Sequence, residues 1–316
     1  MLFFDGVVWQ IGERGQIYTS LDLDHWIPRE SGTTKSLRSL TIFGTNIFIS
    51  AEEGTILSGP NARELTIRTL GTTNWLEGIA GGTHSIVAVG DNGAIYSSED
   101  GLTWDRRGDF TTWLRSVAYG DGQFVRVGEE GFIATSPDGA TWQQRGSDTT
   151  AHLNKVAWLE DRFWIVGDQG TVITNSSATR FAKVNLPLTN TLYTVSASTN
   201  EVMLAGDGIV LLGTRDGALW IRQSDPQTPL LAPDWLYYSS IWDGRLFLLS
   251  GEAGMLVEGF RTNSTAPLYW YSTFQPTRSW LWDVTRVDNF YTAVGANGTI
   301  VTSDDGAKWF REASPV

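Results

Sequence analysis

The stretch GEEGFIATSPDGATWQQR, residues 128–145, recurs along the chain with the same spacing of glycine, aspartate and tryptophan. Close copies are GDNGAIYSSEDGLTWDRR at 90–107 and GANGTIVTSDDGAKWFRE at 295–312. The second glycine of the G-x-x-G turn returns every 38 to 46 residues, at Gly15, Gly54, Gly93, Gly131, Gly170, Gly208, Gly254 and Gly298. A repeat of this length indicates one structural unit per copy, packed against its neighbours.

Each copy contains four short segments with the composition of β-strands. In the fourth copy these are WLRSVAYG (113–120), QFVRVG (123–128), FIATS (132–136) and TWQQR (141–145). They are rich in β-branched and aromatic residues and are separated by glycine, aspartate and serine, as strands are. Four short antiparallel strands repeated at this period describe one blade of a β-propeller.

The eight turns predict an all-β protein, a β-propeller of eight four-stranded blades. A seven-bladed ring is the alternative, and it would need one unit divided between the two chain ends. A leucine in the first strand marks the same register, at Leu37, Leu76, Leu114, Leu153, Leu192, Leu236 and Leu281. We expect one domain over residues 1–316, with units near 1–32, 33–71, 72–109, 110–148, 149–187, 188–228, 229–275 and 276–316. The two long units carry inserts near 224–233 and 262–276.

Composition narrows the classes of partner. The net charge is −12 and the sequence pI about 4.7, which argues against nucleic acid or an anionic membrane surface as the main partner. The chain has no cysteine, so it has no thiol nucleophile and no disulfide. No apolar run is long enough for a membrane-spanning helix, and no signal peptide is visible at the start. We therefore expect neither nucleic-acid binding nor membrane insertion.

A second motif, S-x-D-G-x-x-W, joins the third and fourth strands. An aspartate at a turn accepts hydrogen bonds from backbone N–H groups two or three residues on, and the glycine takes the positive φ. The tryptophan is expected to cover the turn and fill the wedge between blades. The first unit has Asp24 where we expect the glycine, and units two, five and seven lack the motif. We therefore predict a structural role for the turn aspartates Asp22, Asp100, Asp138, Asp216 and Asp305.

This turn resembles the Asp-box, or BNR, motif of bacterial propellers, with one residue fewer between aspartate and tryptophan. Together with the period, it makes the chain similar to Ycf48-like propellers, which act as assembly factors for photosynthetic complexes. The resemblance covers the whole chain by period and five of eight units by motif. It implies a protein partner and an extracytoplasmic location (periplasmic, lumenal or extracellular). Ycf48-like propellers are usually seven-bladed with a basic patch, whereas this chain has eight repeats and is acidic.

The G-x-x-G turns, the connections between units and the first residues of the inner strands should share one face. Aromatic and charged residues gather at these positions, which predicts a mouth of aromatic rings with an acidic rim, suited to sugar rings or a partner's side chains. The candidate contact residues are Trp75, Trp113, Trp235, Trp280, Trp282, Arg38, Arg115, Tyr237, Glu129 and Asp168. The competing interpretation is that the tryptophans only pack between blades and the acidic turns only keep the protein in solution.

These observations favour a non-catalytic binding or scaffold role, in which the protein mediates protein–protein contacts or complex assembly. The chain could equally be a subunit or domain of a larger assembly. The alternatives are carbohydrate binding through the same aromatic residues and a sialidase-like glycoside hydrolase. Against the hydrolase, no third arginine joins Arg38 and Arg115, and the order Trp-Ile-Pro-Arg at 26–29 does not match the sialidase segment.

No catalytic residue and no cofactor is predicted. The three histidines, His25, His84 and His152, occupy three different positions of the repeat, so they should not converge on a metal. No D-x-D-x-D-G loop for Ca²⁺ and no G-x-x-x-x-G-K-[ST] nucleotide motif occurs.

Overall fold

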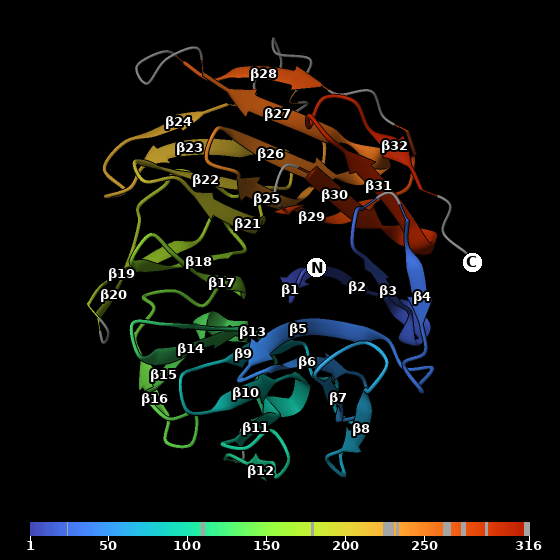
Figure 1. Ribbon diagram of the computed structural model, residues 1–316. Coiled ribbons are helices and arrows are strands. Elements are labelled where there is room, and N and C mark those ends of the chain that lie inside the picture. The colour runs from blue at the N-terminus through green and yellow to red at the C-terminus, as the bar shows by residue number, and fades with distance from the viewer. Residues whose placement is uncertain are drawn as a thin grey trace. The chain divides into compact units, whose positions relative to one another are not determined.

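Each repeat unit forms one four-stranded antiparallel sheet in the computed structural model (Figure 1). The structure describes residues 1–23, 25–108, 111–177, 180–223, 231, 234–261, 267–272, 276–287 and 290–312. The inserts expected near 224–233 and 262–276 lie mostly outside these residues, as does Asp24. No helix in the described part of the chain is long and apolar enough to cross a membrane.

The first four sheets follow the repeat boundaries closely. Their strands are β1 (Leu2–Phe4), β2 (Val7–Ile11), β3 (Ile17–Ser20) and β4 (Ile27–Arg29); β5 (Leu37–Phe43), β6 (Asn46–Ala51), β7 (Thr55–Gly59) and β8 (Thr66–Thr69); β9 (Gly78–Gly81), β10 (Ile86–Val89), β11 (Ile95–Ser98) and β12 (Asp105–Arg106); and β13 (Leu114–Gly120), β14 (Gln123–Gly128), β15 (Ile133–Ser136) and β16 (Gln143–Arg145).

The last four sheets repeat the same order. Their strands are β17 (Leu153–Leu159), β18 (Arg162–Gly167), β19 (Val172–Ser177) and β20 (Arg180–Lys183); β21 (Leu192–Ala197), β22 (Glu201–Gly206), β23 (Val210–Thr214) and β24 (Trp220–Arg222); β25 (Tyr237–Trp242), β26 (Leu246–Gly251), β27 (Leu256–Phe260) and β28 (Tyr269–Ser272); and β29 (Leu281–Val287), β30 (Phe290–Gly295), β31 (Thr299–Ser303) and β32 (Phe310–Arg311). The protein is therefore all-β, with the eight four-stranded blades of a β-propeller, as the eight turns predict.

Two compact units divide the chain. The N-terminal unit comprises Leu2–Thr19 and Ile27–Leu188, and the C-terminal unit comprises Met1, Ser20–Trp26 and Thr189–Val316. Within each unit the core lies between neighbouring blades. Val127, Ile133 and Leu153 pack in one cluster shared by the blades of β13–β16 and β17–β20. In the C-terminal unit Met203, Phe247 and the adjoining buried residues form the equivalent layer. Burial of apolar side chains between blades is thus the main stabilising contribution within each unit.

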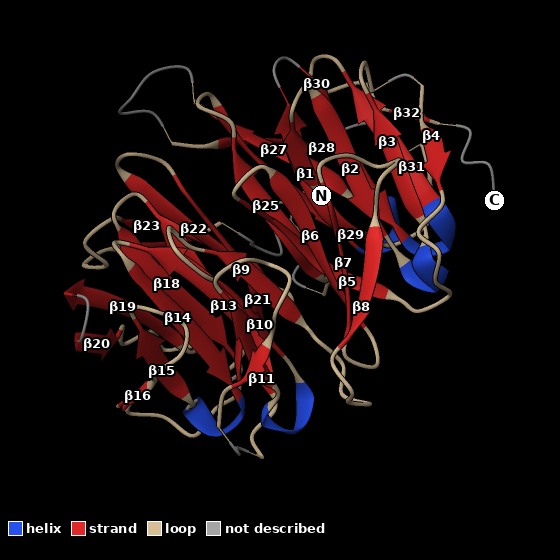
Figure 2. Cartoon of the chain, turned by 60° about the horizontal axis from the view of Figure 1, so that its bottom comes forward, coloured by secondary structure: helices blue, strands red, loops and turns tan. Residues whose placement is uncertain are grey.

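The G-x-x-G turns connect the second and third strands in six blades, and the corresponding turns read AEEG at 51–54 in the second blade and GDG at 206–208 in the sixth. The last glycine of the turn has a φ between 60° and 76° in all eight blades, a left-handed conformation that glycine adopts without a steric penalty. Five of these turns form short 3-10 segments, η1 (Glu13–Gly15), η2 (Asp91–Gly93), η3 (Glu129–Gly131), η4 (Glu252–Gly254) and η5 (Ala296–Gly298), drawn as helical segments in Figure 2. The amide of this glycine also donates to the incoming chain, as Gly131 does to the carbonyl of Ala151 (2.8 Å).

In the seventh blade, the buried residue of the first strand lies one position later than the sequence predicts. Tyr237, not Leu236, pairs with Gly251 and is fully buried, as Leu114 is opposite Gly128 in the fourth blade. The sequence assignment followed the leucine, but the phenol ring of Tyr237 occupies the equivalent place in the core. Consequently every residue predicted from this register in the seventh blade moves by one position.

In the first blade, the sequence assigns the glycine position of the S-x-D-G motif to Asp24, and this assignment is wrong by one residue. Leu23 takes the place of the turn glycine, with a φ of 66°, and its amide donates to Ser20 Oγ (2.8 Å). The motif of this blade is therefore S-x-D-L, and a non-glycine residue carries the strained conformation.

Candidate binding surface

In the N-terminal unit, residues 14 positions apart join the inner strands to the G-x-x-G turns. Arg38 contacts Glu52 (3.1 Å) and Arg115 contacts Glu129 (3.4 Å). Asn154 makes the third such contact, donating through Nδ2 to Asp168 (2.9 Å), and it accepts from Arg115 (2.8 Å). The structure thus brings four of the predicted residues, Arg38, Arg115, Glu129 and Asp168, into short polar pairs.

Two predicted tryptophans of this unit lie under arginine side chains. The guanidinium carbon of Arg38 is 4.4 Å from the ring centroid of Trp75, and that of Arg115 is 5.7 Å from the ring centroid of Trp113. Both distances are within the range of cation–π attraction. Trp75 and Trp113 remain 40% and 39% exposed, so these rings are at the surface and not inside the wedge between blades.

Some carboxylates of the predicted acidic rim accept hydrogen bonds from the backbone, and some pair with arginine. Glu52 Oε2 accepts the backbone amide of Ser36 (3.1 Å), Asp91 that of Trp75 (2.9 Å), and Glu252 that of Leu236 (3.2 Å). These hydrogen bonds therefore hold the backbone in place near the start of the first strand of each of these blades. Burial raises the pKa of Glu77, against the opposing effect of Arg38, which shows that this part of the surface is only partly solvated.

The C-terminal unit presents a different surface, an aromatic cluster of Tyr193, Tyr238, Trp280 and Trp282. Tyr238 lies between the others, with ring centroids 5.8 Å from Tyr193, 6.0 Å from Trp280 and 4.7 Å from Trp282. Trp280 and Trp282 meet edge to face at 5.3 Å. They are 44% and 46% exposed, whereas Tyr193 and Tyr238 are half-buried. Rings from three successive blades thus form one cluster, with the tryptophans of the eighth blade at the surface.

Carboxylates lie close to this cluster. Partial burial raises the pKa of Tyr238, and the charges of Glu252 and Asp207 raise it further, because a neighbouring negative charge disfavours a phenolate. Trp280 also lines an open hollow of about 520 Å³, together with Arg278, Asn297 and Arg311 among others. The cluster thus has carboxylates near Tyr238 and arginines near Trp280.

The register shift changes the interpretation of two of the predicted contact residues, Tyr237 and Trp235. Tyr237 is fully buried, and Trp235 packs against the same core cluster. Tyr193 and Tyr238 hold the surface positions, and sequence reasoning did not select them. Counting 14 residues back from the first glycine of each turn identifies the buried residue in the seventh blade as Tyr237, and the next residue is then Tyr238.

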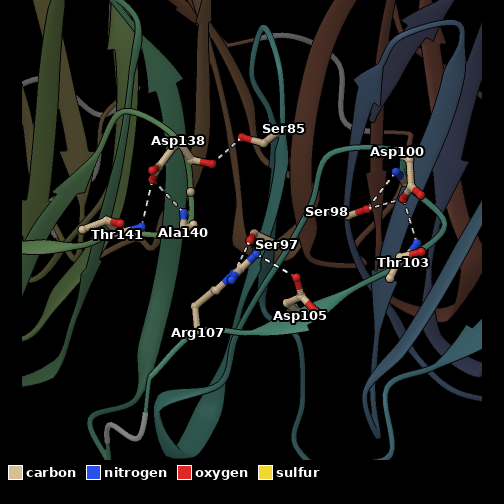
Figure 3. A network of polar contacts seen from close by, with 12 residues as sticks. Ser85, Ser97, Ser98, Asp100, Thr103, Asp105, Arg107, Asp138, Ala140 and Thr141 are labelled. Atoms are coloured by element: carbon tan, nitrogen blue, oxygen red, sulfur yellow. Dashed lines mark hydrogen bonds and ion pairs between the residues drawn. The ribbon is translucent and has the colours of Figure 1, made fainter.

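The S-x-D-G turns have the hydrogen bonds that the motif implies (Figure 3). Asp138 Oδ1 accepts from the amides of Ala140 (2.9 Å) and Thr141 (2.8 Å). Asp100 makes the same pair of contacts, and the hydrogen bond from the Thr103 amide is the main reason that its pKa falls to about 2. The turn also links blades, because Ser85 Oγ donates to the backbone carbonyl of Asp138 (2.8 Å).

The turn tryptophans pack between blades. The indole N–H of Trp142 donates to the carbonyl of Gly139 (2.9 Å), and the ring packs against the cluster shared by the third and fourth blades. Its face also lies 4.4 Å from the guanidinium carbon of Arg126. Arg126 is fully buried, and burial lowers its pKa to about 9. A cation against an aromatic face is thus also part of the interior of this unit.

A repeated arginine on the fourth strand went unnoticed in the sequence. Arg29, Arg107 and Arg145 each donate through Nε to a hydroxyl ten residues earlier on the third strand, at 2.8 to 2.9 Å. The signal was the fixed spacing of ten between Ser or Thr and Arg. These arginines therefore stabilise blade edges and are not surface contacts.

The described residues contain no group of three or more His, Asp or Glu side chains that could hold a metal ion. The three histidines therefore do not form such a site in the described part of the chain.

Neither a family model nor a curated protein matches the sequence. Among solved structures, Ycf48 bound to a D1 peptide is 17% identical with a TM-score of 0.59, over 81% of this chain and 88% of that one. YCF48 from Cyanidioschyzon merolae is 10% identical with a TM-score of 0.61, over 85% and 95%. The computationally designed Ika8 protein is 12% identical with a TM-score of 0.77, over 95% and 94%. At these identities the likeness concerns the fold, which is that of the β-propellers.

Proposed function

We propose that the protein is a non-catalytic binding module that holds a polypeptide segment of a partner on the aromatic cluster of the C-terminal unit. The observation that carries the proposal is the exposure of Trp280 and Trp282 beside Tyr193 and Tyr238. Exposed tryptophan and tyrosine in a continuous patch are typical of interaction sites. One structure with this fold contains a bound peptide, the D1 peptide on Ycf48, which supports a role in assembly.

A glycosidase role has less support. Hydrolysis of a glycosidic bond generally needs two carboxylates on opposite sides of the substrate. Glu258 has a pKa raised to about 7, as a catalytic acid would, but it is buried in β27, against the β31–β32 turn. Its position suits a packing role better than contact with a sugar.

We also infer that the S-x-D-G-x-x-W turns are a short form of the Asp-box. The support is that the carboxylates of Asp100 and Asp138 accept hydrogen bonds only from their own turns among the described residues. Their contribution is then to folding, and partner binding is left to the aromatic cluster.

Photo-cross-linking tests the binding role. A benzoylphenylalanine at position 282 is expected to form one discrete protein adduct in an extract of the source cells. The control replaces Leu102, which is exposed on an S-x-D-G turn, and is expected to form none. Equal labelling from both positions, or none from either, would contradict the proposal. A glycan array follows, and binding of an oligosaccharide that depends on Trp282 would replace the peptide by a sugar.

A further inference from the structure

The two units have different residue types at the same position of the repeat. In the second and fourth blades, which belong to the N-terminal unit, the residue after the buried leucine is Arg38 or Arg115, and each guanidinium lies over a neighbouring tryptophan. In the C-terminal unit the equivalent positions are Tyr193, Tyr238 and Trp282. Among the described residues, no arginine or lysine stacks on Tyr238, Trp280 or Trp282. Within the described part of the C-terminal unit, Tyr238, Trp280 and Trp282 thus have no stacked cation of their own.

We propose that the aromatic cluster binds the arginine or lysine side chain of a partner's basic segment, at the side formed by Tyr238 and Trp282. This inference rests on the proposed function and specifies its partner. The chain itself shows the geometry, since Arg38 over Trp75 and Arg126 over Trp142 both lie 4.4 Å from a ring centroid. Aromatic faces attract cations through their quadrupole, tryptophan most strongly.

Charge complementarity places the cation at the Tyr238 side. Glu252 and Asp207 are close enough to Tyr238 to raise its pKa. Glu252 is positioned by its hydrogen bond from the Leu236 amide, so its charge stays beside the rings. Trp280 also lines the hollow that contains Arg278 and Arg311, where like charges would repel a cation. The protein's net charge of −12 favours the same class of partner.

Fluorine NMR tests this inference residue by residue. The fifteen tryptophans are replaced by 5-fluorotryptophan in the full chain, and single Trp→Phe variants assign the signals. The probes are acetyl-Gly-Arg-Gly-amide and its citrulline counterpart, which has nearly the same shape without the charge. We expect the arginine peptide to shift the signals of Trp280 and Trp282, and the citrulline peptide to bind at least five-fold more weakly. The signals of Trp75 and Trp113 should not move, because Arg38 and Arg115 already cover those rings.

Matched variants separate recognition from general charge attraction. Tyr238→Leu is expected to raise the dissociation constant of the arginine peptide about 5- to 30-fold, the loss of one partly desolvated cation–π contact. Trp75→Leu removes an exposed ring that Arg38 already covers, and should leave the dissociation constant unchanged. In the converse variant, Arg38→Ala, the signal of Trp75 should begin to respond to the arginine peptide.

Three results would overturn the inference: no shift at Trp280 or Trp282, equal binding of the arginine and citrulline peptides, or shifts spread evenly over all tryptophans. The two proposals fail separately. A position-282 adduct that excess arginine peptide does not displace would leave partner binding standing and remove the basic segment. NMR shifts caused by the arginine peptide, without any cross-linked protein, would support recognition of the arginine side chain and contradict the binding of a protein partner.

Discussion

Gly131 needs to be glycine for two separate reasons. Its φ is 69°, and a Cβ built there would lie 2.0 Å from the backbone oxygen of Thr149. Gly122 in the same blade has a similar φ of 71°, but a Cβ there would meet nothing within 4 Å. The pair therefore separates the cost of the conformation from the cost of the close approach.

We expect Gly122→Ala to lower the free energy of unfolding by about 1 kcal/mol, through its positive φ alone. Gly131→Ala should lower it by about 3 kcal/mol or more, because the backbone of residue 149 must also move. Urea denaturation of both variants measures the difference. Equal losses would mean that the turn relaxes without disturbing the connection between blades.

Asp138 tests the structural role of the turn carboxylate. Replacing it by alanine removes the acceptor of two backbone amides, and we expect a loss of about 1–2 kcal/mol in the free energy of unfolding. Glu99→Ala is the control, since Glu99 is exposed at the matching place beside Asp100. Loss of arginine-peptide binding in Asp138→Ala, without a change in Tm, would contradict the structural role.

Asp100 gives this role a pH dependence. Its pKa is about 2 in the folded protein, below the ordinary value of 3.8. The stabilisation is therefore fully present above about pH 4 and is lost as the pH falls through about 2. Thermal melts between pH 4.5 and 2 should show a smaller loss of Tm in Asp100→Asn than in the wild type. Identical slopes would show that the hydrogen bonds of Asp100 contribute nothing to stability.

At the scale of the element, β27 contains a carboxyl group, that of Glu258, whose pKa is raised instead of lowered. Glu258 is 6% exposed, and its Oε1 accepts no hydrogen bond from any described residue. Burial raises its pKa to about 7; Arg245 opposes this shift, while Asp305 and Asp243 add to it. Because the folded pKa lies above the ordinary 4.5, the proton on Glu258 is retained on folding. Glu258 therefore destabilises the interface of the seventh and eighth blades progressively as the pH rises from about 4.5 to about 7, and the full cost is present above pH 7.

Glu258→Gln should therefore raise the stability of the protein at pH 8, by about 1–2 kcal/mol after allowance for solvent screening. At pH 4 the variant and the wild type should melt at nearly the same temperature, because the carboxyl of Glu258 is then mostly protonated in both the folded and the unfolded chain. Calorimetry at the two pH values checks this. A gain of equal size at both would show that the carboxyl is not the titrating group.

The elements were predictable where the chemistry of a turn determines them. The eight turns between second and third strands indicated the number of blades, since each ends in a glycine with positive φ. The register of the seventh blade was not predictable from residue type, because Tyr237 fills a place that leucine fills in the third to sixth blades. The contacts of Arg38 and Arg115 also escaped prediction, since they join strands to turns 14 residues away. The aromatic cluster could not be predicted in full, because it depends on the register of the seventh blade and on which tryptophans the arginines cover.

At the scale of the whole molecule, charge and aromatic surface have separate roles. The net charge of −12 is spread along the chain and attracts any basic partner from a distance, whereas Tyr238 and Trp282 act only on contact. Long-range attraction raises the association rate and is screened by salt, but short-range contacts determine mostly the dissociation rate. The two contributions can therefore be separated by kinetics.

We expect the association rate of an immobilised arginine-containing peptide to fall at least five-fold between 50 and 500 mM NaCl, because the Debye length shrinks from above about 10 Å to below about 5 Å. The dissociation rate should change much less over the same range. Tyr238→Leu should show the opposite pattern, with faster dissociation and an unchanged association rate, since the net charge of the variant is unchanged. Surface plasmon resonance with the citrulline peptide as reference measures both. An association rate that salt does not affect would show that the acidic character of the protein has no part in finding its partner.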